Sequence, residues 1–489
     1  MKNILIAIRS IFKKGRHNVM KIVSLGVGLA VGLVLIAKVY FEQSYDDFYP
    51  DRDRVYQVWA KYQQNGGELK DYPQTSGGIA PTMQQQIPEI ETVTRYTSFG
   101  DWTFTMTDTK MKYSGRCIIA DSCFFDILPR PMLIGNAKEV LSTPMYVLVS
   151  SRIAKNIGGD VIGKNFTVDS SPGRTMTIGG VFEEVPENSH SRYDVIVSMA
   201  SAGRFMWEGS PTNMLGNDRY ISYVKLHKGV NPLALEEQVH TFVNSYFPPE
   251  EQQKTGFNIG FSFHELDGLH KELPQVKRMT WILSLLAFAL IFTAVMNYIL
   301  IVISSIVNRS KEVAVHKCYG ASENNIHGMM FGEALVHIVL SLILALLLIL
   351  AFRGTVEELL ATSLDSLLLS NGSLVLLGIC ILVFFVSGFM PGSLYARIPV
   401  ASAFRNYREN KRIWKKALLL VQFVATGFLV TMLVFVARQY TFMVNDRPGY
   451  AYENLAYCGL AGVDSTSRAK ILDEVMRLPG VVAATTVYQ

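Results

Sequence analysis

The sequence predicts a membrane protein, in which an α-helical bundle of five transmembrane helices carries a large α+β extracytoplasmic domain. Of 489 residues, 49% are hydrophobic and only 18% are charged, which is more apolar than a soluble chain needs. The excess is concentrated in five uncharged blocks of roughly 16 to 30 residues, near the ~20 that cross a bilayer as a helix. A polar stretch of about 235 residues separates the first two blocks and is long enough to fold on its own.

The edges of these blocks divide the chain. The divisions are a cytoplasmic amphipathic helix at 1–18; transmembrane helices at 19–41, 278–307, 333–352, 373–395 and 417–437; the extracytoplasmic domain at 42–277; a cytoplasmic loop at 308–332; an external loop at 353–372; a cytoplasmic loop at 396–416; and the start of a second, incomplete extracytoplasmic domain at 438–489.

Positive charge sets the predicted orientation, because short cytoplasmic loops retain lysine and arginine during insertion. The tail before the first helix is basic without an acidic residue, and the loop at 396–416 is rich in arginine and lysine. Both are therefore expected inside, which places 42–277 outside. The net charge of +5 follows from this topology and does not indicate nucleic acid as a partner.

The first helix is expected to be a retained anchor, because no A-x-A-like cleavage site follows it. Lys21 and Lys38 flank its apolar block, where long side chains can reach the lipid headgroups. Gly28 and Gly32 have the Gly-x-x-x-Gly spacing, with Ser24 one turn earlier. Such small residues let transmembrane helices approach each other closely, so this face is expected to pack on a neighbour.

The extracytoplasmic domain has mixed patterning. Arg54 to Lys61 and Arg219 to Lys225 alternate like strands, whereas Pro232 to Tyr246 has apolar residues at helical spacing. Ala120 to Leu128 and Val147 to Val197 are expected to hold short strands between Gly and Pro turns, as a second lobe that could be inserted into the first.

The stretch GGDVIGKN, Gly158 to Asn165, has the G-x-x-x-x-G-K spacing of a phosphate-binding loop. The motif also needs a Ser or Thr hydroxyl at its last position, where Asn165 offers an amide, and no hydrophobic strand precedes it. We therefore expect a Gly-rich turn between a helix ending near Asn156 and a strand beginning near Phe166.

Metal and disulfide chemistry have weak signals. His264 and His270 are six residues apart, which places them on different faces of a helix, whereas a zinc-binding helix needs an i, i+4 pair. No metal site and no catalytic residue is predicted. Cys117 and Cys123 both lie in the extracytoplasmic domain, where a disulfide and two free thiols are equally compatible with the sequence.

The stretch Asn297 to Val336 predicts a helix leaving the bilayer, a charged helical piece from Arg309 to Tyr319, a stop at Gly320 and a second start toward the third helix. This segment resembles the FtsX-like, MacB-like ABC transporter permeases, whose equivalent helix carries lysine and glutamate and ends in a Gly-Ala-Ser/Thr turn. Cys318-Tyr319 departs from the smaller aliphatic pair that is commoner there.

The resemblance extends over nearly the whole chain. The other similar stretches are Ala120 to Ile127, Ile162-Gly163-Lys164, Gly180-Val181-Phe182 through Pro186-Glu187-Asn188-Ser189-His190, and Ser387-Gly388-Phe389 through Pro399-Val400.

The resemblance implies a non-catalytic permease subunit of the bacterial inner membrane, with a cytoplasmic N-terminus and a MacB-like periplasmic core domain. The chain would hold no cofactor, because a separate cytoplasmic ABC ATPase dimer binds ATP and Mg²⁺. The residues expected to contact this ATPase are Arg309, Lys311, Glu312, Val313, Val315, Lys317, Gly320, Ala321 and Ser322. A solvated loop without a partner is the alternative, but it would leave Val313 and Val315 exposed without a reason.

The chain also resembles itself. Gln86 to Ile90 is similar to Arg477 to Val481, and the exit of the first helix is similar to the exit of the fifth. The pattern indicates one full unit and the start of a second, so we expect a truncated form of a duplicated, eight-helix permease. Its partners would then include the missing half or a second permease copy, besides the lipid membrane and a possible periplasmic adaptor.

The predicted function is the coupling of ATP hydrolysis in the ATPase subunit to motion of the periplasmic domain. The motion would drive efflux or extraction of a hydrophobic or peptide client. The alternative is a regulatory transducer that controls cell-wall hydrolases or senses antimicrobial peptides. The large extracytoplasmic domain favours the transporter.

Overall fold

The structure, a computed structural model, describes residues 17–168, 171–216, 218–368, 372–396, 400, 413–445, 454–458 and 465–485. The chain separates into two compact units. The membrane unit contains Met1–Ser44 and Lys271–Ala451, and the external unit contains Tyr45–His270 and Tyr452–Gln489. The amphipathic helix expected at 1–18 and most of the loop expected at 396–416 lie outside the described residues.

Five helices of the membrane unit are long and apolar enough to cross a bilayer. They are α2 (Asn18–Gln43), α11 (Pro274–Ser304), α13 (Glu323–Ala351), α16 (Ser373–Ala396) and α18 (Ile413–Asn445). Each has an 18-residue window with a mean hydropathy of 2.4 or more. The prediction of five transmembrane helices is therefore confirmed.

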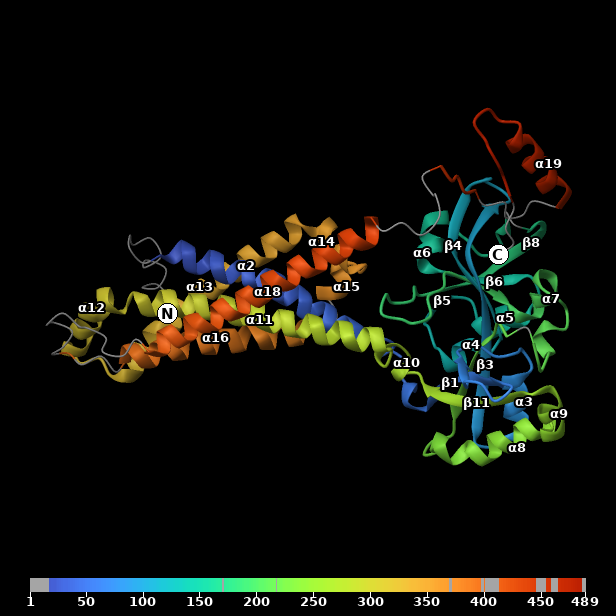
Figure 1. The fold of residues 1–489 in the computed structure, drawn as a ribbon, viewed down its shortest axis with the longest axis horizontal. Helices are drawn as coiled ribbons and strands as arrows, with labels where there is room; N and C mark the ends of the chain where they lie inside the picture. Colours follow the sequence, from blue (N-terminus) through green and yellow to red (C-terminus); the bar gives the residue numbers. More distant parts are fainter. Residues whose placement is uncertain are drawn as a thin grey trace. The chain divides into compact units, whose positions relative to one another are not determined.

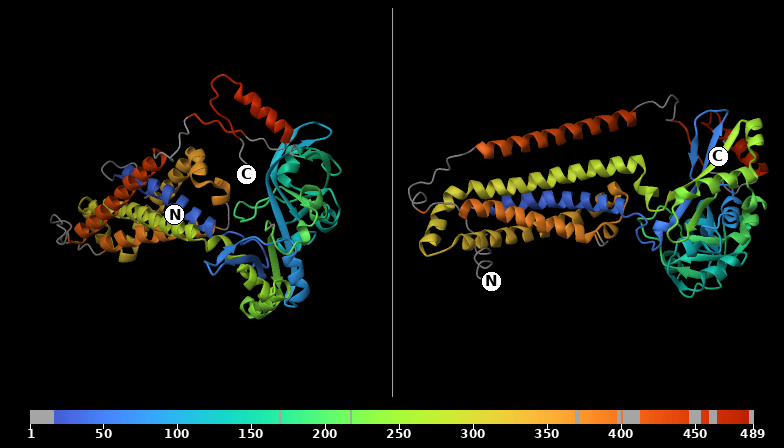
Figure 2. Two further views of the ribbon diagram at one scale, coloured as in Figure 1. Left: turned by 45° about the vertical axis from the view of Figure 1, so that its right-hand side comes forward. Right: turned by 90° about the horizontal axis from the view of Figure 1, so that it is seen from below.

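Helices α2, α11, α13 and α16 pack into one bundle, in which α2 lies against both α11 and α13 (Figure 1). Leu25, Leu29, Tyr298, Ile299 and Ile338 are among the buried residues of its core. Helix α18 runs beside the bundle (Figure 2) and contacts α11, but only 6% of its apolar window is buried within the described residues. Lipid tails are as apolar as these side chains and can cover that surface.

Within the described residues, three shorter helices lie between the spans. Helix α12 (Ile306–Cys318) lies between α11 and α13, and α14 (Arg353–Leu360) and α15 (Leu364–Leu368) lie between α13 and α16. Helix α15 packs on α2, so part of the connection between the third and fourth spans belongs to the bundle.

Eleven strands of the external unit form one mixed sheet. They are β1 (Val55–Gln64), β2 (Lys70–Tyr72), β3 (Ile90–Met106), β4 (Lys112–Ala120), β5 (Met132–Ile134), β6 (Tyr146–Ser150), β7 (Asn165–Val168), β8 (Ser171–Phe182), β9 (Val195–Ser198), β10 (Ile221–Leu226) and β11 (Phe257–Glu265). The strand order is β11-β1-β10-β3-β4-β9-β6-β8-β5, with β2 beside β1 and β7 beside β3 and β8. The pairs β4–β9 and β6–β8 are parallel.

The 17-residue strand β3 joins two lobes of this sheet. Its first part pairs with β10 and its later part with β4 and β7. The register shifts between Ser98 and Gly100, and Gly100 has a φ of 72°, as expected of a bulge that bends a long strand. Residues 112–205 thus form a second lobe between β3 and β10, built on the same sheet as the first.

Helices cover the sheet in both lobes. The first lobe has α3 (Ile79–Gln86), α8 (Glu236–Tyr246) and α9 (Pro249–Thr255); the second has α4 (Phe124–Ile127), α5 (Ala137–Ser142), α6 (Ser151–Ile157) and α7 (Ala202–Phe205); α10 (Gly268–Lys271) follows β11. Met83 and Phe242 bring α3 and α8 onto Val58 and Val224 of the sheet, because each presents its apolar face there.

Most predicted elements of the external domain are present. The expected strands at Arg54 to Lys61 and Arg219 to Lys225 correspond to β1 and β10, and the expected helix at Pro232 to Tyr246 to a short 3₁₀ turn followed by α8. The prediction of a strand after Ala120 is wrong. There the Phe124 N–H bonds the Asp121 carbonyl, and a fully buried Phe124 begins the helical turn α4.

The predicted internal repeat has a common local structure. Helix α3 ends at Gln86, and α19 (Ser465–Met476) ends just before Arg477. In the first turn the Ile90 N–H bonds the Ile87 carbonyl at 3.1 Å, and at the equivalent place the Val481 N–H bonds the Leu478 carbonyl at 3.2 Å. Both stretches are therefore a helix followed by a tight turn with the same hydrogen bond, although Gly480 has a φ of 100° and Glu89 at the equivalent position has a negative φ.

Candidate functional site

The chain changes direction at the end of α11, where α12 begins. The Val302 carbonyl accepts hydrogen bonds from the Ser305 hydroxyl at 2.6 Å and from the Tyr395 hydroxyl at 3.0 Å. Tyr395 lies on α16 and is fully buried. The Ser305 N–H also bonds this carbonyl, at 3.2 Å, and the hydroxyl of Tyr395 adds a bond from a neighbouring helix. The break at Ser305 is therefore held in place by α16.

A defined turn links α12 to α13. Gly320 has a φ of 88°, its N–H bonds the Lys317 carbonyl, and the Ala321 N–H bonds the His316 carbonyl, both at 3.0 Å. This pair of bonds is a Schellman motif, in which glycine is favoured because of its positive φ. Ser322 then caps α13, since its hydroxyl accepts from the Asn325 N–H. We call residues 306–322 the α12 segment.

The α12 segment has one buried face and one exposed face. Val313 and Ala314 are each 1% exposed and belong to the bundle core, whereas Val315 is 44% exposed and Tyr319 is 89% exposed. The expectation that Val313 and Val315 share one exposed apolar surface is therefore wrong. Consecutive odd positions of a helix lie about 200° apart, so only one of the two can face the bundle.

The other residues expected in this segment are distributed along it. Lys311 is exposed, Glu312 and Lys317 are half-buried, and Gly320 to Ser322 form the turn. Arg309 lies in α12, but its side chain is outside the described part of the structure. The exposed surface of the segment thus contains Val315, Tyr319 and the charged Lys311.

The first transmembrane helix touches α11 through its glycines. A Cβ atom placed on Gly28 would overlap with the Cβ of Ala294, and one placed on Gly32 would overlap with Cγ1 of Ile291. The Ser24 hydroxyl bonds the Lys21 carbonyl of its own helix at 3.3 Å. The close contact between α2 and α11 therefore requires glycine at positions 28 and 32.

The two lysines that flank the first apolar block do not reach outward, contrary to expectation. Lys21 is 1% exposed, and its ammonium donates to Asn18 at 3.3 Å. Lys38 forms an ion pair with Glu42 at 2.7 Å and donates to the Thr362 hydroxyl at 2.8 Å. Thr362 lies between α14 and α15, so this cluster fastens the end of α2 to that connection. The i, i+4 spacing of Lys38 and Glu42 is a sequence signal that could have revealed the pair.

Replacing Lys38 with methionine is expected to lower the stability of the membrane unit by about 3–5 kcal/mol, because it removes the ammonium group that pairs with the buried Glu42 carboxylate and donates to Thr362. The double variant Lys38→Met/Glu42→Leu should recover most of that loss. Thermal unfolding in mild detergent measures both. If the single and double variants are equally destabilised, the ion pair does not account for the effect.

Polar side chains inside the bundle also connect helices. The Tyr298 hydroxyl of α11 lies 3.1 Å from Nδ1 of His337 on α13, and the Ser341 hydroxyl donates to the Ile22 carbonyl of α2. His337 thus connects α13 to α11, and Ser341 connects α13 to α2. Glu333, on α13, is 8% exposed and was missed because it borders the predicted third block.

In the external unit, the first residues after α2 are held by a buried polar cluster. The Asp46 carboxylate accepts from the Ser189 hydroxyl at 3.0 Å and lies 2.7 Å from Nδ1 of His190. Nε2 of His190 lies 2.5 Å from the Tyr223 hydroxyl. Burial raises the pKa of Tyr223 well above its ordinary value, so that hydroxyl stays protonated. The Ser189-His190 pair, part of one of the resembling stretches, therefore anchors the chain as it enters the domain.

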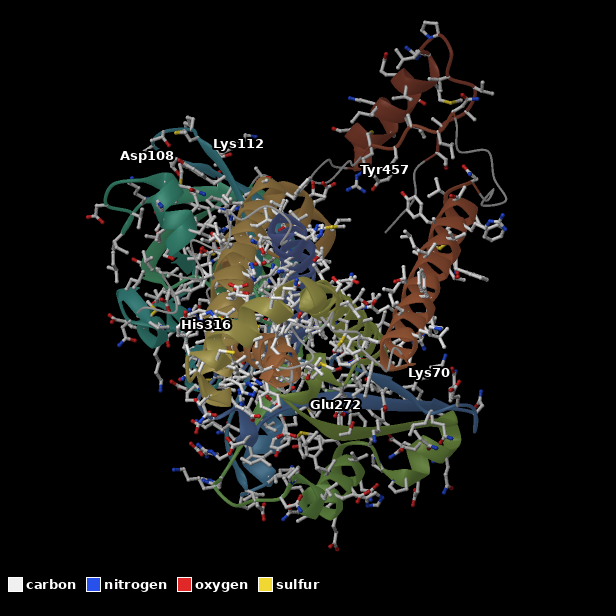
Figure 3. The ribbon with its side chains drawn as sticks, turned by 90° about the vertical axis from the view of Figure 1, so that its left-hand side faces the viewer. Lys70, Asp108, Lys112, Glu272, His316 and Tyr457 are labelled. Carbon is white, nitrogen blue, oxygen red and sulfur yellow. The ribbon has the colours of Figure 1, made fainter. Side chains whose placement is uncertain are left out.

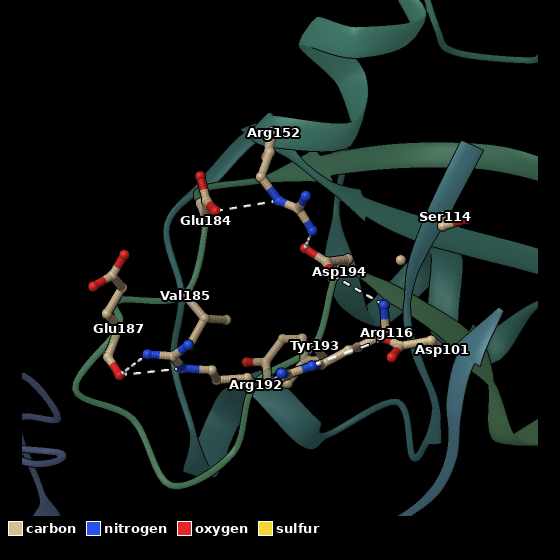
Figure 4. Close-up of a pocket in the computed structure, with 11 residues that line it drawn as sticks. Asp101, Ser114, Arg116, Arg152, Glu184, Val185, Glu187, Arg192, Tyr193 and Asp194 are labelled. Carbon is tan, nitrogen blue, oxygen red and sulfur yellow. Dashed lines mark hydrogen bonds and ion pairs between the residues drawn. The ribbon is translucent and has the colours of Figure 1, made fainter. Parts of the chain in front are cut away.

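The loop between β8 and β9, which carries Ser189 and His190, is held by ion pairs near both of its ends. Figure 4 shows Arg152 of α6 between Glu184 and Asp194, with nitrogen–oxygen distances of 3.3 Å and 2.6 Å. Arg152 therefore bridges Glu184, the second residue after β8, and Asp194, the residue that precedes β9. These residues line a pocket of about 350 Å³ in which the arginines and acids largely satisfy one another.

The GGDVIGKN stretch lies after a helix and not before one. Helix α6 ends at Ile157, strand β7 begins at Asn165, and the Lys164 ammonium bonds back to the Gly158 carbonyl at 3.2 Å. A phosphate-binding loop needs its N–H groups at the start of a helix. The stretch is the Gly-rich turn that the sequence predicts.

The histidines and cysteines examined in the sequence have local roles. His264 lies on β11 and stacks on Trp59 at 4.1 Å, and its pKa is lowered by burial; His270 stacks on Tyr45 at 3.5 Å. Cys117 and Cys123 are free thiols, the first buried in β4 and the second donating to the Val93 carbonyl. Burial raises the pKa of both thiols, which makes them poor nucleophiles.

Comparison with known proteins identifies two domains. Residues 20–242 match the model of the MacB-like periplasmic core domain, and residues 284–400 match the FtsX-like permease C-terminal domain. No curated protein matches the chain.

Two similar solved structures are extracellular or permease domains. A domain of a putative permease protein from Porphyromonas gingivalis is 32% identical over 44% of this chain and 91% of that one, with a TM-score of 0.41. The extracellular domain of the noncanonic ABC-type transporter YknZ from Gram-positive bacteria is 10% identical over 42% of this chain and 98% of that one, with a TM-score of 0.30. With its five apolar helices and its extracellular domain, the chain belongs to the family of FtsX-like ABC transporter permeases with a MacB-like periplasmic core domain.

Proposed function

We propose that this permease subunit couples ATP hydrolysis in a separate cytoplasmic ABC ATPase dimer to motion of its periplasmic domain. The observation that supports this most is the exposed face of the α12 segment. Val315 and Tyr319 present apolar surface there, beside Lys311, while Val313 fixes the same helix to the bundle core. A short helix with one face in the core and one face free can transmit a push from a docked partner to the helices behind it.

The proposed orientation places the N-terminus and the α12 segment in the cytoplasm of a bacterial cell and the external unit in the periplasm. The basic residues before α2 and in 396–416 support it, because they favour the inner side of the membrane. The same orientation brings the exposed face of α12 to the compartment where an ATPase finds ATP.

Motion of the membrane helices would reach the external unit through the end of α2. Lys38, Glu42 and Thr362 fasten that end within the membrane unit. Four residues beyond Glu42, Asp46 is bound by Ser189 and His190 in the external unit. We infer a stroke that drives efflux or extraction of a hydrophobic or peptide client, with no catalytic residue or cofactor in this chain. A periplasmic adaptor and a second set of permease helices are further proposed partners.

An ATPase assay on affinity-purified protein tests the proposal. ATP hydrolysis should co-purify with an ABC ATPase and should vanish when the Walker lysine of that subunit is replaced. Lys164→Ala in this chain should leave the rate unchanged, because the Lys164 ammonium bonds the Gly158 carbonyl at the C-terminal end of α6. Hydrolysis that needs Lys164 and no second subunit would refute the proposal.

A growth assay distinguishes the transporter from the regulatory alternative. Loss of an efflux subunit should raise sensitivity to peptides or other hydrophobic toxic compounds while cells separate normally. Unchanged sensitivity together with chaining cells would instead indicate control of cell-wall hydrolases.

A further inference from the structure

A second pocket of the external unit lies in the first lobe, away from the polar pocket of Figure 4. It has a volume of about 550 Å³, within the range of sites for drug-sized ligands. Its lining comes from three separate parts of the chain: Tyr62, Tyr72 and Gln74 near the β1–β2 hairpin, Leu215, Gly216 and Asp218 before β10, and Phe257 at the start of β11. We call it the aromatic pocket.

Three aromatic rings form one side of the aromatic pocket. The Tyr62 ring stacks on Phe257 with centroids 5.2 Å apart, and it lies 5.5 Å from the Tyr72 ring. Register explains this grouping, because Tyr62 on β1 lies two residues from the partner of Tyr72 on β2 and two from the partner of Phe257 on β11. Alternate residues of a strand share a face. Tyr72 is 43% exposed and Leu215 is 49% exposed, so the apolar wall is accessible to a ligand.

One carboxylate lies among these rings. Oδ2 of Asp218 accepts from the Tyr62 hydroxyl at 2.6 Å, and Oδ1 accepts from the Ser76 hydroxyl. Burial and the nearby carboxylate raise the pKa of Tyr62, which therefore remains a neutral donor. Both bonds come from neutral hydroxyls, and no lysine, arginine or histidine pairs with Asp218 within the described ranges. The two hydroxyls fix the carboxylate in position and leave its charge uncompensated.

The contrast with the polar pocket is informative. In the polar pocket, Arg152 neutralises Asp194 and Glu184, so a ligand would have to displace existing ion pairs. In the aromatic pocket a negative charge already faces electron-rich rings, and both attract a cation. Neither the carboxylate nor the ring faces would attract an anion or a purely apolar molecule in this way.

We propose that the aromatic pocket binds an organic cation with an apolar body, whose ammonium group pairs with Asp218 while its hydrocarbon part packs on Tyr62, Tyr72 and Phe257. The inference concerns the external unit by itself. Its test uses no nucleotide, so it can fail or succeed independently of the proposed coupling to an ATPase.

Lys70 is the residue of the protein itself that could compete with a bound cation for Asp218, because it lies opposite Tyr62 in the β1–β2 pairing. Lys70 pairs with Tyr62 across β1 and β2 and lies at the end of that hairpin (Figure 3), but it is exposed and does not line the pocket. Removing its charge should therefore strengthen ligand binding slightly. If binding appeared only in Lys70→Gln, the wild-type pocket would already be closed by its own lysine, and the proposal would be wrong.

Equilibrium dialysis of the full chain in a non-ionic detergent, without ATP, tests the proposal with benzyltrimethylammonium as the probe. We expect saturable binding, with benzyl alcohol and benzenesulfonate at least tenfold weaker. Asp218→Asn keeps the shape of the side chain and should weaken the cation at least tenfold. Tyr72→Leu keeps an apolar wall without a ring and should weaken it about threefold to tenfold.

Asp71→Asn is the matched control. Asp71 is the neighbour of Tyr72 on β2, is exposed and does not line the pocket, so its removal changes the net charge equally without touching the site. The affinity of the Asp71→Asn variant for benzyltrimethylammonium should equal that of the wild type. Equal loss in Asp71→Asn and Asp218→Asn would show a general charge effect, and equal binding of benzyl alcohol would show plain hydrophobic partition. Either result overturns the proposal.

A second comparison distinguishes the source of the ammonium group. The same dialysis with the capped dipeptide Ac-Phe-Lys-NH₂ and with its Ac-Phe-Gln-NH₂ counterpart measures whether a lysine side chain is accepted. Tighter binding of the lysine peptide than of benzyltrimethylammonium would identify a peptide ligand. The opposite order would identify a small amphiphilic cation. If neither probe is sensitive to Asp218→Asn, the pocket is not a cation site.

Discussion

Gly28→Ala is expected to lower the stability of the membrane unit by about 1–3 kcal/mol, because the added methyl group overlaps with the Cβ of Ala294 and forces α2 away from α11. A Cβ atom cannot rotate aside, so the two backbones must move apart. Gly32→Ala should cost less, since its neighbour is the flexible side chain of Ile291. Thermal unfolding in detergent, monitored as the loss of monodisperse protein, shows which of the two variants is the less stable.

Two other glycines in membrane helices provide controls. Among the described residues, Gly378 on α16 and Gly427 on α18 have no atom within 4 Å of an added Cβ, apart from their own helix. Gly378→Ala and Gly427→Ala should be neutral or slightly stabilising, because alanine favours helix by up to about 1 kcal/mol. If Gly28→Ala behaves like these controls, α2 and α11 are not in close contact.

Val315→Asp is expected to abolish most of the stimulation of the ATPase by the permease, by roughly tenfold or more, while membrane insertion and thermal stability stay unchanged. Val315 is 44% exposed, so a carboxylate there remains solvated in the free protein but would be buried in an apolar contact with a partner. The measurement is ATP hydrolysis by the reconstituted complex, compared with the ATPase alone.

Val313→Asp is the comparison that separates docking from folding. Val313 is 1% exposed, so an aspartate would place a charge in the bundle core. We expect this charge to destabilise the folded protein by several kcal/mol and so to reduce the yield of folded protein. Loss of stability in Val315→Asp, or full stability in Val313→Asp, would mean that the two faces of α12 are assigned the wrong way round.

The sequence alone was sufficient for features that depend on local chemistry. The five spans follow from length and hydropathy, and the stop at Gly320 follows from the need for a positive φ at a helix end. The turn at Gly158 to Asn165 followed from a missing hydroxyl at Asn165 and from the lack of a hydrophobic strand directly before it. In each case the deciding information lies within a few residues or within one uninterrupted apolar block.

Features that depend on distant neighbours could not be read in this way. Val313 and Val315 look alike in the sequence, and only the packing of α12 on the bundle separates them. The sequence placed Lys38 at the lipid headgroups, but the hydroxyl that accepts its hydrogen bond belongs to Thr362, which is 324 residues away. The aromatic pocket combines Tyr62, Asp218 and Phe257, which no spacing in the sequence relates.

Cysteine cross-linking from Cys318 tests most directly whether the α12 segment docks on an ATPase. Cys318 is exposed at the end of α12, and Cys458 is exposed in the external unit. In intact spheroplasts an impermeant maleimide should label Cys458 but not Cys318. After lysis, a short cross-linker should join Cys318 to an ABC ATPase, and Cys318→Ser should abolish the product. Labelling of Cys318 from outside, or a full yield of cross-linked ATPase in Cys318→Ser, would contradict the proposed coupling.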